Sequence, residues 1–376
     1  MHPNPANHPL AASDAALARY APDADPAAVP AVALADLDAR VEELLARSQA
    51  HNTMRAYRSD LRTFADWAAG LGITEVPVPP RNVARFLAWS ADQGLKISTI
   101  ERRLAALSWL HRKLDAPPPS AHGLVKETMK GIRRELREDG RTRPDPKAAL
   151  SPAEIVAMVD ACRADFLDRP HGGDRLSAEQ RRANRLDLLA RRDTALLLLG
   201  YAGGMRRSEL ANLRSIDIDH RPDGLVVLLR WSKGDQEGHG RLVGIRPHPT
   251  DERYCPVRQT REWLARIKLV TGSEPSRLGP LFRRIHRSGT VIASPISGQT
   301  VALVIKSRAR AAETPTTPDR LAGHSLRRGM ITALSERDVA VDRIADHVGH
   351  QDVNTTRGYR DKAVVLDSSP SALVWA

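Results

Sequence analysis

The sequence predicts a mainly α-helical protein of two domains, the second of which also contains a small antiparallel sheet. Three observations lead to this prediction. The chain has 376 residues, more than one average domain holds. Hydrophobic residues make up 41% of it and aromatic residues 4%, with apolar side chains recurring mostly at helical spacing. A polar stretch at residues 138–149, rich in Arg and Pro, is typical of an interdomain linker.

The first domain is expected to be a bundle of short helices over residues 37–137. Residues 1–36 before it are rich in Ala and Pro and nearly free of large apolar side chains, which predicts a disordered tail. Ser98 is the expected N-cap of a helix that runs through Leu110. Apolar stripes predict the other helices near residues 37–45, 48–67, 83–93 and 124–136.

The second domain is expected over residues 150–376. Ser151, followed by Pro152 and Glu154, is typical of a helix N-terminus. An apolar helix core follows at 194–201. Two β-rich runs, 225–231 and 241–245, flank a polar stretch and predict a hairpin with a long tip. Further helices are expected at 256–269, 298–311, 324–335 and 341–348.

The charge of the chain indicates a polyanionic partner. The formal net charge is +12, and the first 40 residues hold two arginines and five aspartates, so the rest of the chain carries 55 basic and 40 acidic side chains. A basic body of this kind favours nucleic acid first and an anionic membrane second.

The sequence carries no sign of a membrane or secreted protein. No apolar run is long enough for a transmembrane helix, and no signal peptide is visible at the N-terminus. Two cysteines, Cys162 and Cys255, are too few for a disulfide framework or a Cys-based zinc site. A cytoplasmic protein, associated with a bacterial or phage nucleoid, is therefore expected.

Four stretches of the second domain carry polar residues that suit a chemical site. They are Gly204-Met-Arg-Arg-Ser-Glu-Leu, the hairpin tip, His324-Ser-Leu-Arg, and Gly349-His followed nine residues later by a tyrosine. The candidate residues in these stretches are Arg206, Lys233, His324, Arg327, His350 and Tyr359. Each alone has an ordinary explanation: an arginine that caps a helix, a lysine that aids solubility, or a tyrosine that packs.

Together the six residues resemble the catalytic set of the tyrosine recombinase (phage integrase) family, in order and in separation. Glu209, two residues past the first Arg-Arg pair, matches the supporting acidic residue of that pattern. The resemblance covers about residues 40–376, because the helical domain resembles the SAM-like core-binding domain, notably around Arg55 and at 94–114 in Cre-type members. Gly203 and Arg328 depart from the pattern, where Thr and His are frequent.

The resemblance implies site-specific DNA recombination with Tyr359 as the nucleophile that forms a 3′-phosphotyrosyl intermediate. The residue types suit this reaction. The guanidinium groups of Arg206 and Arg327 are permanently charged and can each make two hydrogen bonds to the oxygens of a phosphodiester during displacement. Tyrosine has an ordinary pKa near 10, so its hydroxyl must lose a proton to attack at neutral pH.

The remaining three residues supply proton transfer and hydrogen bonding. His324 is expected to accept the tyrosine proton, Lys233 to protonate the leaving 5′-oxygen, and His350 to donate to a non-bridging oxygen. A phosphotyrosyl bond preserves the energy of the phosphodiester, so neither ATP nor a metal or other cofactor is expected. His347 and His350 form a His-x-x-His pair without an evident third ligand.

Double-stranded DNA is the expected partner. Phosphate contacts are predicted for basic residues of the helical domain, each with a solvated helix face as the alternative. These residues are Arg55, Arg102, Arg103, Lys126, Lys130, Arg133 and Arg134. The resemblance also implies a C-shaped clamp on DNA and a homotetramer linked through exchange of the apolar C-terminal tail, which otherwise packs on its own domain.

Two other functions would explain only some of these features. A type IB topoisomerase shares the chemistry on a single duplex, but the context of His350 and the helical first domain disfavour it. A catalytically silent DNA-binding protein would leave all six residues without a purpose. The absence of a clear arm-binding domain favours a simple Cre- or Xer-like recombinase over a lambda-type integrase.

Overall fold

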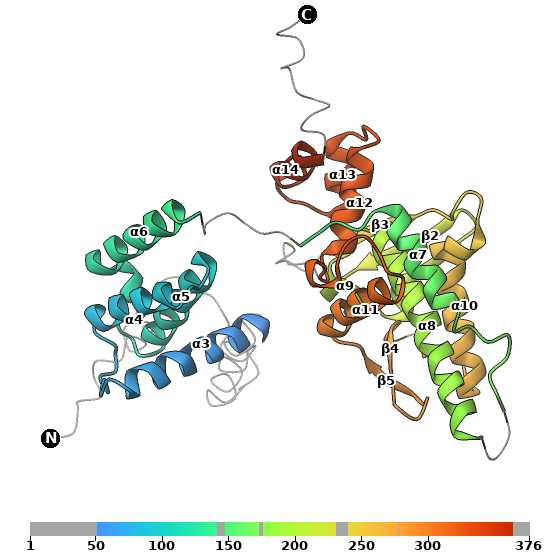
Figure 1. Cartoon of the computed structure of the whole chain (residues 1–376), viewed down its shortest axis with the longest axis horizontal. Coiled ribbons are helices and arrows are strands. Elements are labelled where there is room, and N and C mark those ends of the chain that lie inside the picture. Colours follow the sequence, from blue (N-terminus) through green and yellow to red (C-terminus); the bar gives the residue numbers. More distant parts are fainter. Residues whose placement is uncertain (1–50, 141–146, 173–175, 231–239, 277, 364–376) are drawn as a thin grey trace, which may run out of the picture. The chain divides into compact units, whose positions relative to one another are not determined.

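The computed structural model describes residues 51–140, 147–172, 176–230, 240–276 and 278–363, with the backbone alone for 51–52 and 359–363. The predicted tail, the helix predicted at 37–45, Lys233 in the hairpin tip, and the chain after residue 363 lie outside the described residues. The chain divides into two compact units, residues 1–144 and 145–376, and each is described by itself (Figure 1).

The first unit is a bundle of helices, as predicted. Its helices are α3 (His51–Ala69), α4 (Pro80–Asp92), α5 (Ile97–Lys113), a 3-10 turn (Pro119–Ala121) and α6 (Gly123–Glu138). Each α-helix turns one apolar face inward, and Phe64, Phe86, Leu107 and Met129 from successive helices share a single core. The predicted cap was wrong: Lys96 is the N-cap of α5, without a side-chain hydrogen bond.

The second unit is a mixed helical and β domain, also as predicted. Its helices are α7 (Pro152–Arg163), α8 (Ala178–Ala202), α9 (Arg207–Asn212), α10 (Pro256–Thr271), α11 (Gly298–Ala311), α12 (Ser325–Ser335), α13 (Val341–Val348) and α14 (Val353–Ala363). Its strands are β1 (Ile218–Arg221), β2 (Gly224–Leu229), β3 (Arg241–Ile245), β4 (Arg283–Ile285) and β5 (Val291–Pro295). Three 3-10 turns complete it, Ser215–Asp217, Glu252–Tyr254 and Pro318–Arg320.

The predicted hairpin is confirmed and belongs to a three-stranded antiparallel sheet of order β1-β2-β3. Val227 lies opposite Val243 in the β2–β3 pairing, and both side chains are buried. Alternate residues of β2 therefore face the core, as expected for a sheet with one covered side. Strand β1 and the second antiparallel pair, β4–β5, were not predicted.

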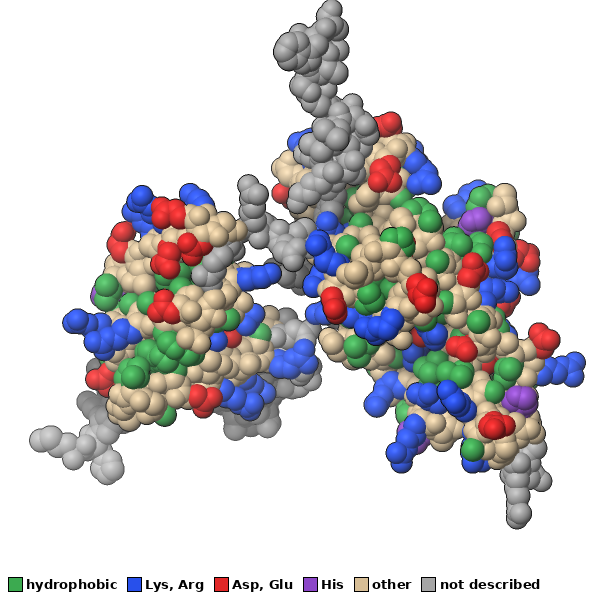
Figure 2. Space-filling model, in the orientation of Figure 1, with side chains coloured by type: hydrophobic (Ala, Val, Ile, Leu, Met, Phe, Trp, Pro, Cys, Tyr) green, Lys and Arg blue, Asp and Glu red, His purple; other side chains and the backbone are tan. Residues whose placement is uncertain are grey.

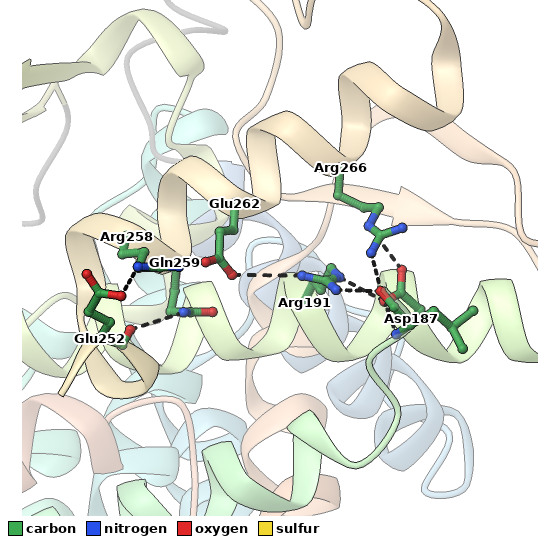
Figure 3. Close-up of polar contacts among 8 residues, drawn as sticks. Asp187, Arg191, Glu252, Arg258, Gln259, Glu262 and Arg266 are labelled. Atoms are coloured by element: carbon green, nitrogen blue, oxygen red, sulfur yellow. Dashed lines mark hydrogen bonds and ion pairs between the residues drawn. The ribbon is translucent and has the colours of Figure 1, made fainter. Parts of the chain in front are cut away.

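Helix α8 is the central element of the second unit, and α10 packs along it (Figure 1). Its segment from Thr194 to Gly200 is buried throughout. In the first half of the helix, Asp187 is fully buried and its carboxylate lies 2.8 Å from Nε of Arg191 and 3.4 Å from Nε of Arg266 on α10 (Figure 3). A buried carboxylate needs such partners, so this network aligns the two helices.

A capping box begins α7 at the predicted position. The Ser151 hydroxyl accepts from the Glu154 backbone N–H at 3.2 Å, and the Glu154 carboxylate accepts from the Ser151 backbone N–H at 2.8 Å. The same carboxylate accepts from the Thr316 backbone N–H at 3.0 Å, which anchors the segment that leads into α12. In the described part of the chain, every helix is too short or too polar to cross a bilayer.

Candidate active site

The first predicted arginine is placed by a tight turn at the end of α8. Gly204 has a positive φ of +54°, and a Cβ on it would lie 2.7 Å from Cγ1 of Val348 and 3.1 Å from Sδ of Met330. A residue without a side chain therefore allows α8 to approach α12 and α13 closely. The turn leads directly to Arg206, which is the N-cap of α9.

Glu209 fixes the Arg206 side chain from the first turn of α9. Its Oε1 accepts from Nη1 of Arg206 at 2.7 Å, while its Oε2 accepts from the Arg206 backbone N–H at 2.7 Å. The Glu209 side chain is 1% exposed and that of Arg206 is 19% exposed. The supporting residue of the motif thus holds the guanidinium at the edge of the unit, partly open to solvent.

Helix α12 brings the second arginine and its histidine to the same place. Arg327 is buried, and its Nη1 donates to the Gly204 carbonyl at 2.9 Å and to the Val348 carbonyl. His324, one turn earlier, is the N-cap of α12 and is an exposed residue. Desolvation by the surrounding protein lowers the pKa of His324, and the charges of Arg207 and Arg327 lower it further.

His350 follows the end of α13. Gly349 is the helix C-cap in the left-handed region, with φ +65°. The Nδ1 atom of His350 lies 2.6 Å from Oγ1 of Thr356, a fully buried side chain on α14. Burial lowers the pKa of His350 to about 4, with further lowering by the charges of Arg327, Arg206 and Arg241.

Three arginines bind three consecutive carbonyl groups at the end of α13. The carbonyl of His347 accepts from Arg241, that of Val348 from Arg327, and that of Gly349 from Arg206, the last at 3.3 Å. The last carbonyls of a helix have no partner within it, and cations are favourable there. Arg241 was not predicted, because no local motif marks it.

Of the other two predicted residues, the structure describes the backbone of Tyr359 and does not describe Lys233. Tyr359 lies on α14, whose backbone packs against α12 and α13. Lys233 belongs to the tip between β2 and β3, outside the described residues, although the paired strands on either side of it are in place. The structure therefore brings together Arg206, His324, Arg327 and His350, and adds Arg241 to them.

One histidine of the His-x-x-His pair has a structural contact. Nε2 of His347 lies 3.0 Å from the Ala202 carbonyl, so this ring joins α13 to the end of α8. Within the residues that the structure describes, no three His, Cys, Asp or Glu side chains are grouped as a metal site would require.

Two of the predicted DNA-contact residues in the first unit have partners within the protein. Arg103 is buried, its Nη1 donates to the Ser90 hydroxyl at 2.7 Å, and its guanidinium lies over the ring of Phe86. Arg103 thus lies on the inner face of α5, and its phosphate contact stays a prediction. Arg102 is bound bidentately by the buried Asp60, at 2.7 and 3.1 Å.

The remaining candidates lie on exposed surfaces. Arg55 on α3 is exposed. Four others lie on α6, whose opposite face is buried: Lys126, Lys130, Arg133 and Arg134. Arg133 pairs with Glu101 and Arg134 with Glu138, each at 2.9 Å. Lys and Arg side chains are spread over the visible surface of both units, with acidic side chains between them (Figure 2).

Sequence comparisons connect both units with known proteins. A model of the Phage integrase family matches residues 178–364, and a model of the Phage integrase N-terminal SAM-like domain matches residues 41–116. The integrase/recombinase xerD homolog of Selenomonas ruminantium is 30% identical over 333 residues, covering 88% of this chain and 87% of its own. Tyrosine recombinase XerD of Pseudomonas aeruginosa is 28% identical over 317 residues, covering 84% and 88%.

Solved structures share the fold. The XerH site-specific recombinase, bound to a palindromic difH substrate in a post-cleavage complex, matches with a TM-score of 0.51 and 15% identity, over 86% of this chain and 82% of that one. The lambda integrase dimer bound to a COC′ core site matches with a TM-score of 0.50 and 18% identity, over 92% and 81%.

Proposed function

The chain belongs to the tyrosine recombinase family of site-specific DNA recombinases, and from this we propose that it cleaves and rejoins DNA through a 3′-phosphotyrosyl intermediate on Tyr359. We propose further that four copies exchange strands between two duplexes. One observation carries the proposal: Arg206, His324, Arg327 and His350, from separate parts of the chain, converge beside the helix that holds Tyr359.

The charge of the site suits a phosphodiester. The guanidiniums of Arg206, Arg241 and Arg327 all act on His350, and the Glu209 carboxylate pairs with Arg206 and lies near Arg241. Such an excess of fixed positive charge favours an anion, and most strongly the more highly charged transition state of phosphoryl displacement. Arg206 and Arg327 are the residues we assign to the non-bridging oxygens, because planar guanidinium forks match that geometry.

The lowered pKa of His324 suits a base. A neutral imidazole can accept the Tyr359 proton as the phenolic oxygen attacks phosphorus. The bond to the 5′-oxygen breaks at the same time, and Lys233 is the residue we assign to protonate that oxygen. Rejoining is the reverse reaction: a 5′-hydroxyl attacks the phosphotyrosine and gives its proton to Lys233, while the bond to the tyrosine oxygen breaks and His324 returns a proton to that oxygen.

His350 is suited to donate a hydrogen bond to the phosphate. In the tautomer whose Nδ1 accepts from the Thr356 hydroxyl, the ring proton is on Nε2, the nitrogen on the other side. The contact with Thr356 also fixes the orientation of the ring. Because Thr356 lies three residues before Tyr359 on α14, the same hydrogen bond connects His350 to the helix of the nucleophile.

The test is to trap the protein–DNA adduct. Cells that express the wild-type chain are lysed in denaturant, and the DNA covalently attached to protein is sequenced at its ends. We expect 3′ ends at one site flanked by inverted half-sites, and no adduct with Tyr359→Phe, which should still bind the same DNA. An adduct formed by Tyr359→Phe, or none formed by the wild type, would refute the proposal.

A second measurement separates recombination from topoisomerase action. A plasmid that carries two copies of the trapped site should give recombinant circles with the wild-type chain. Relaxation of supercoils on plasmids without the site, with no recombinants, would support the type IB topoisomerase instead.

A further inference from the structure

Arg241 is a partly buried cation that the catalytic motif does not include. It is the first residue of β3, and its Nη1 donates to the His347 carbonyl. Its Nε and Nη2 atoms are inaccessible to solvent and have no hydrogen-bond partner among the described residues. Burial lowers the pKa of Arg241, and the nearby Arg206 lowers it further, against an opposite effect of Glu209.

The same side chain fills the space beside Gly349. A Cβ built on Gly349 would lie 2.5 Å from Nε and 2.8 Å from Cδ of Arg241. Arg241 therefore contacts both the last turn of α13, through the His347 carbonyl, and the left-handed residue that ends it. His350 is the next residue along the chain. Arg241 therefore restricts the backbone that places His350.

Stability alone does not account for an arginine at this position. A buried charge costs free energy unless it is paired, and an apolar side chain of similar length would fill the same volume without that cost. The inaccessible nitrogens also prevent Arg241 from reaching a phosphate that approaches from solvent. What the guanidinium supplies is a directed hydrogen bond to a helix-end carbonyl, next to those made by Arg327 and Arg206.

We propose that Arg241 is a positioning residue that holds the Gly349–His350 turn in the geometry required for DNA cleavage. The proposal rests on the proposed function, in which His350 contacts the scissile phosphate. Arg241 completes a set of three arginines on successive carbonyls, but it differs from Arg206 and Arg327 because it acts through His350 and not on the DNA.

The experiment measures single-turnover formation of the covalent complex on a nicked duplex that contains the trapped site. Arg241→Met keeps an aliphatic side chain and removes the charge and the hydrogen bond. We expect its cleavage rate to fall by about 10- to 100-fold, as is common when a group that orients a functional residue is lost. Its affinity for the duplex, from gel-shift titration, should stay unchanged. Arg246→Met, on an exposed residue just after β3, is the matched control and should cleave at the wild-type rate.

Coupling to His350 separates positioning from a general structural effect. If Arg241 acts through His350, the double variant Arg241→Met/His350→Ala should cleave no more slowly than His350→Ala alone. Losses that multiply, or an Arg241→Met enzyme at the wild-type rate, would overturn the proposal. A wild-type chain that forms no adduct would instead refute the proposed function.

A conservative variant covers the case in which Arg241→Met does not fold. Arg241→Lys retains the charge but lacks the planar guanidinium group. That group contacts the His347 carbonyl and Gly349 at the same time. We expect this variant to bind the duplex normally and to cleave severalfold more slowly than the wild type, again without further loss in the His350→Ala background. A wild-type rate for Arg241→Lys in that case would contradict the proposal.

Discussion

The two histidines of the site are surrounded by cations, which sets their protonation. Partial burial and nearby arginines lower the pKa of both His324 and His350, the latter to about 4. A positively charged imidazole would face the same guanidiniums that attract the phosphate. Both rings are therefore neutral near pH 7 in the DNA-free protein, and bound DNA should shift each pKa upward because its phosphate supplies the missing negative charge.

The lowered pKa of His350 predicts a loss of stability in mild acid. An unfolded chain binds this proton near pH 6.5, and the folded protein only near pH 4, so stability falls as the pH decreases between these values. We expect the melting temperature to drop between pH 7 and pH 5, and to drop less in His350→Gln, as measured by differential scanning fluorimetry. His171→Gln, at an exposed position, should keep the wild-type dependence; equal slopes for all three proteins would contradict the assignment.

The residues of the site that could be predicted carry a local pattern. Arg206, His324, Arg327 and His350 stand in short motifs, and the structure places them together. Arg241 stands in an ordinary strand, and its partners are more than 100 residues away in the chain. A role that depends on tertiary contacts alone has no signal in a single sequence. The contacts of Arg103 with Ser90 and Phe86 were not predicted for the related reason that they join separate helices.

At the scale of elements, the end of α13 is the most constrained segment of the site. Gly349 takes a left-handed conformation, which costs about 1 kcal/mol or more for a residue with a Cβ. A methyl group there would also meet the Arg241 side chain at 2.5 Å. The turn before His350 thus depends on both a glycine and an arginine.

Gly349→Ala is therefore predicted to lower the free energy of unfolding by roughly 1 to 3 kcal/mol, from strain and from displacement of Arg241. Urea titration followed by circular dichroism measures this change. The matched control is Gly358→Ala on α14, where nothing lies within 4 Å of the added carbon and the backbone is helical. It should be neutral or slightly stabilising. A similar loss in both variants would show that the turn has no special constraint.

Elements with a clear apolar period were predictable, and the shortest strands were not. The helices at 298–311 and 341–348 have the predicted bounds, because apolar periodicity and clear ends define them. Strands β1 and β4 have four and three residues, too few for an alternating pattern to appear. The N-cap of α5 is Lys96, so Ser98 lies in the first turn of the helix; helix ends are less well defined by sequence than helix interiors.

At the scale of the whole molecule, the two units have separate cores. The core of the first unit is built from α3 to α6, and that of the second from elements after residue 147. All the described residues of the candidate active site belong to the second unit. We therefore expect the first unit to contribute DNA affinity and not chemistry. The clamp and the tetramer expected from the family resemblance stay predictions.

Helix α6 is the element of the first unit best suited to bind phosphates. Its apolar residues are buried on one face, while Lys126 and Lys130 lie one turn apart on the exposed side. Lys130 is 3.6 Å from Glu127, and both side chains are more than 70% exposed, so this pair is weak and easily replaced. Arg133 and Arg134 would have to leave shorter ion pairs before they could bind DNA.

The double variant Lys126→Gln/Lys130→Gln is therefore predicted to weaken DNA binding about equally on all sequences, because phosphate contacts carry no base information. Each lost contact should reduce the slope of log K against log salt by about 1, so the slope should fall by about 2 in titrations between 50 and 200 mM salt. Arg258→Gln/Lys268→Gln removes the same charge from exposed positions on α10 and should leave the slope unchanged. Equal reductions in both double variants would mean that net charge, and not this face of α6, governs affinity.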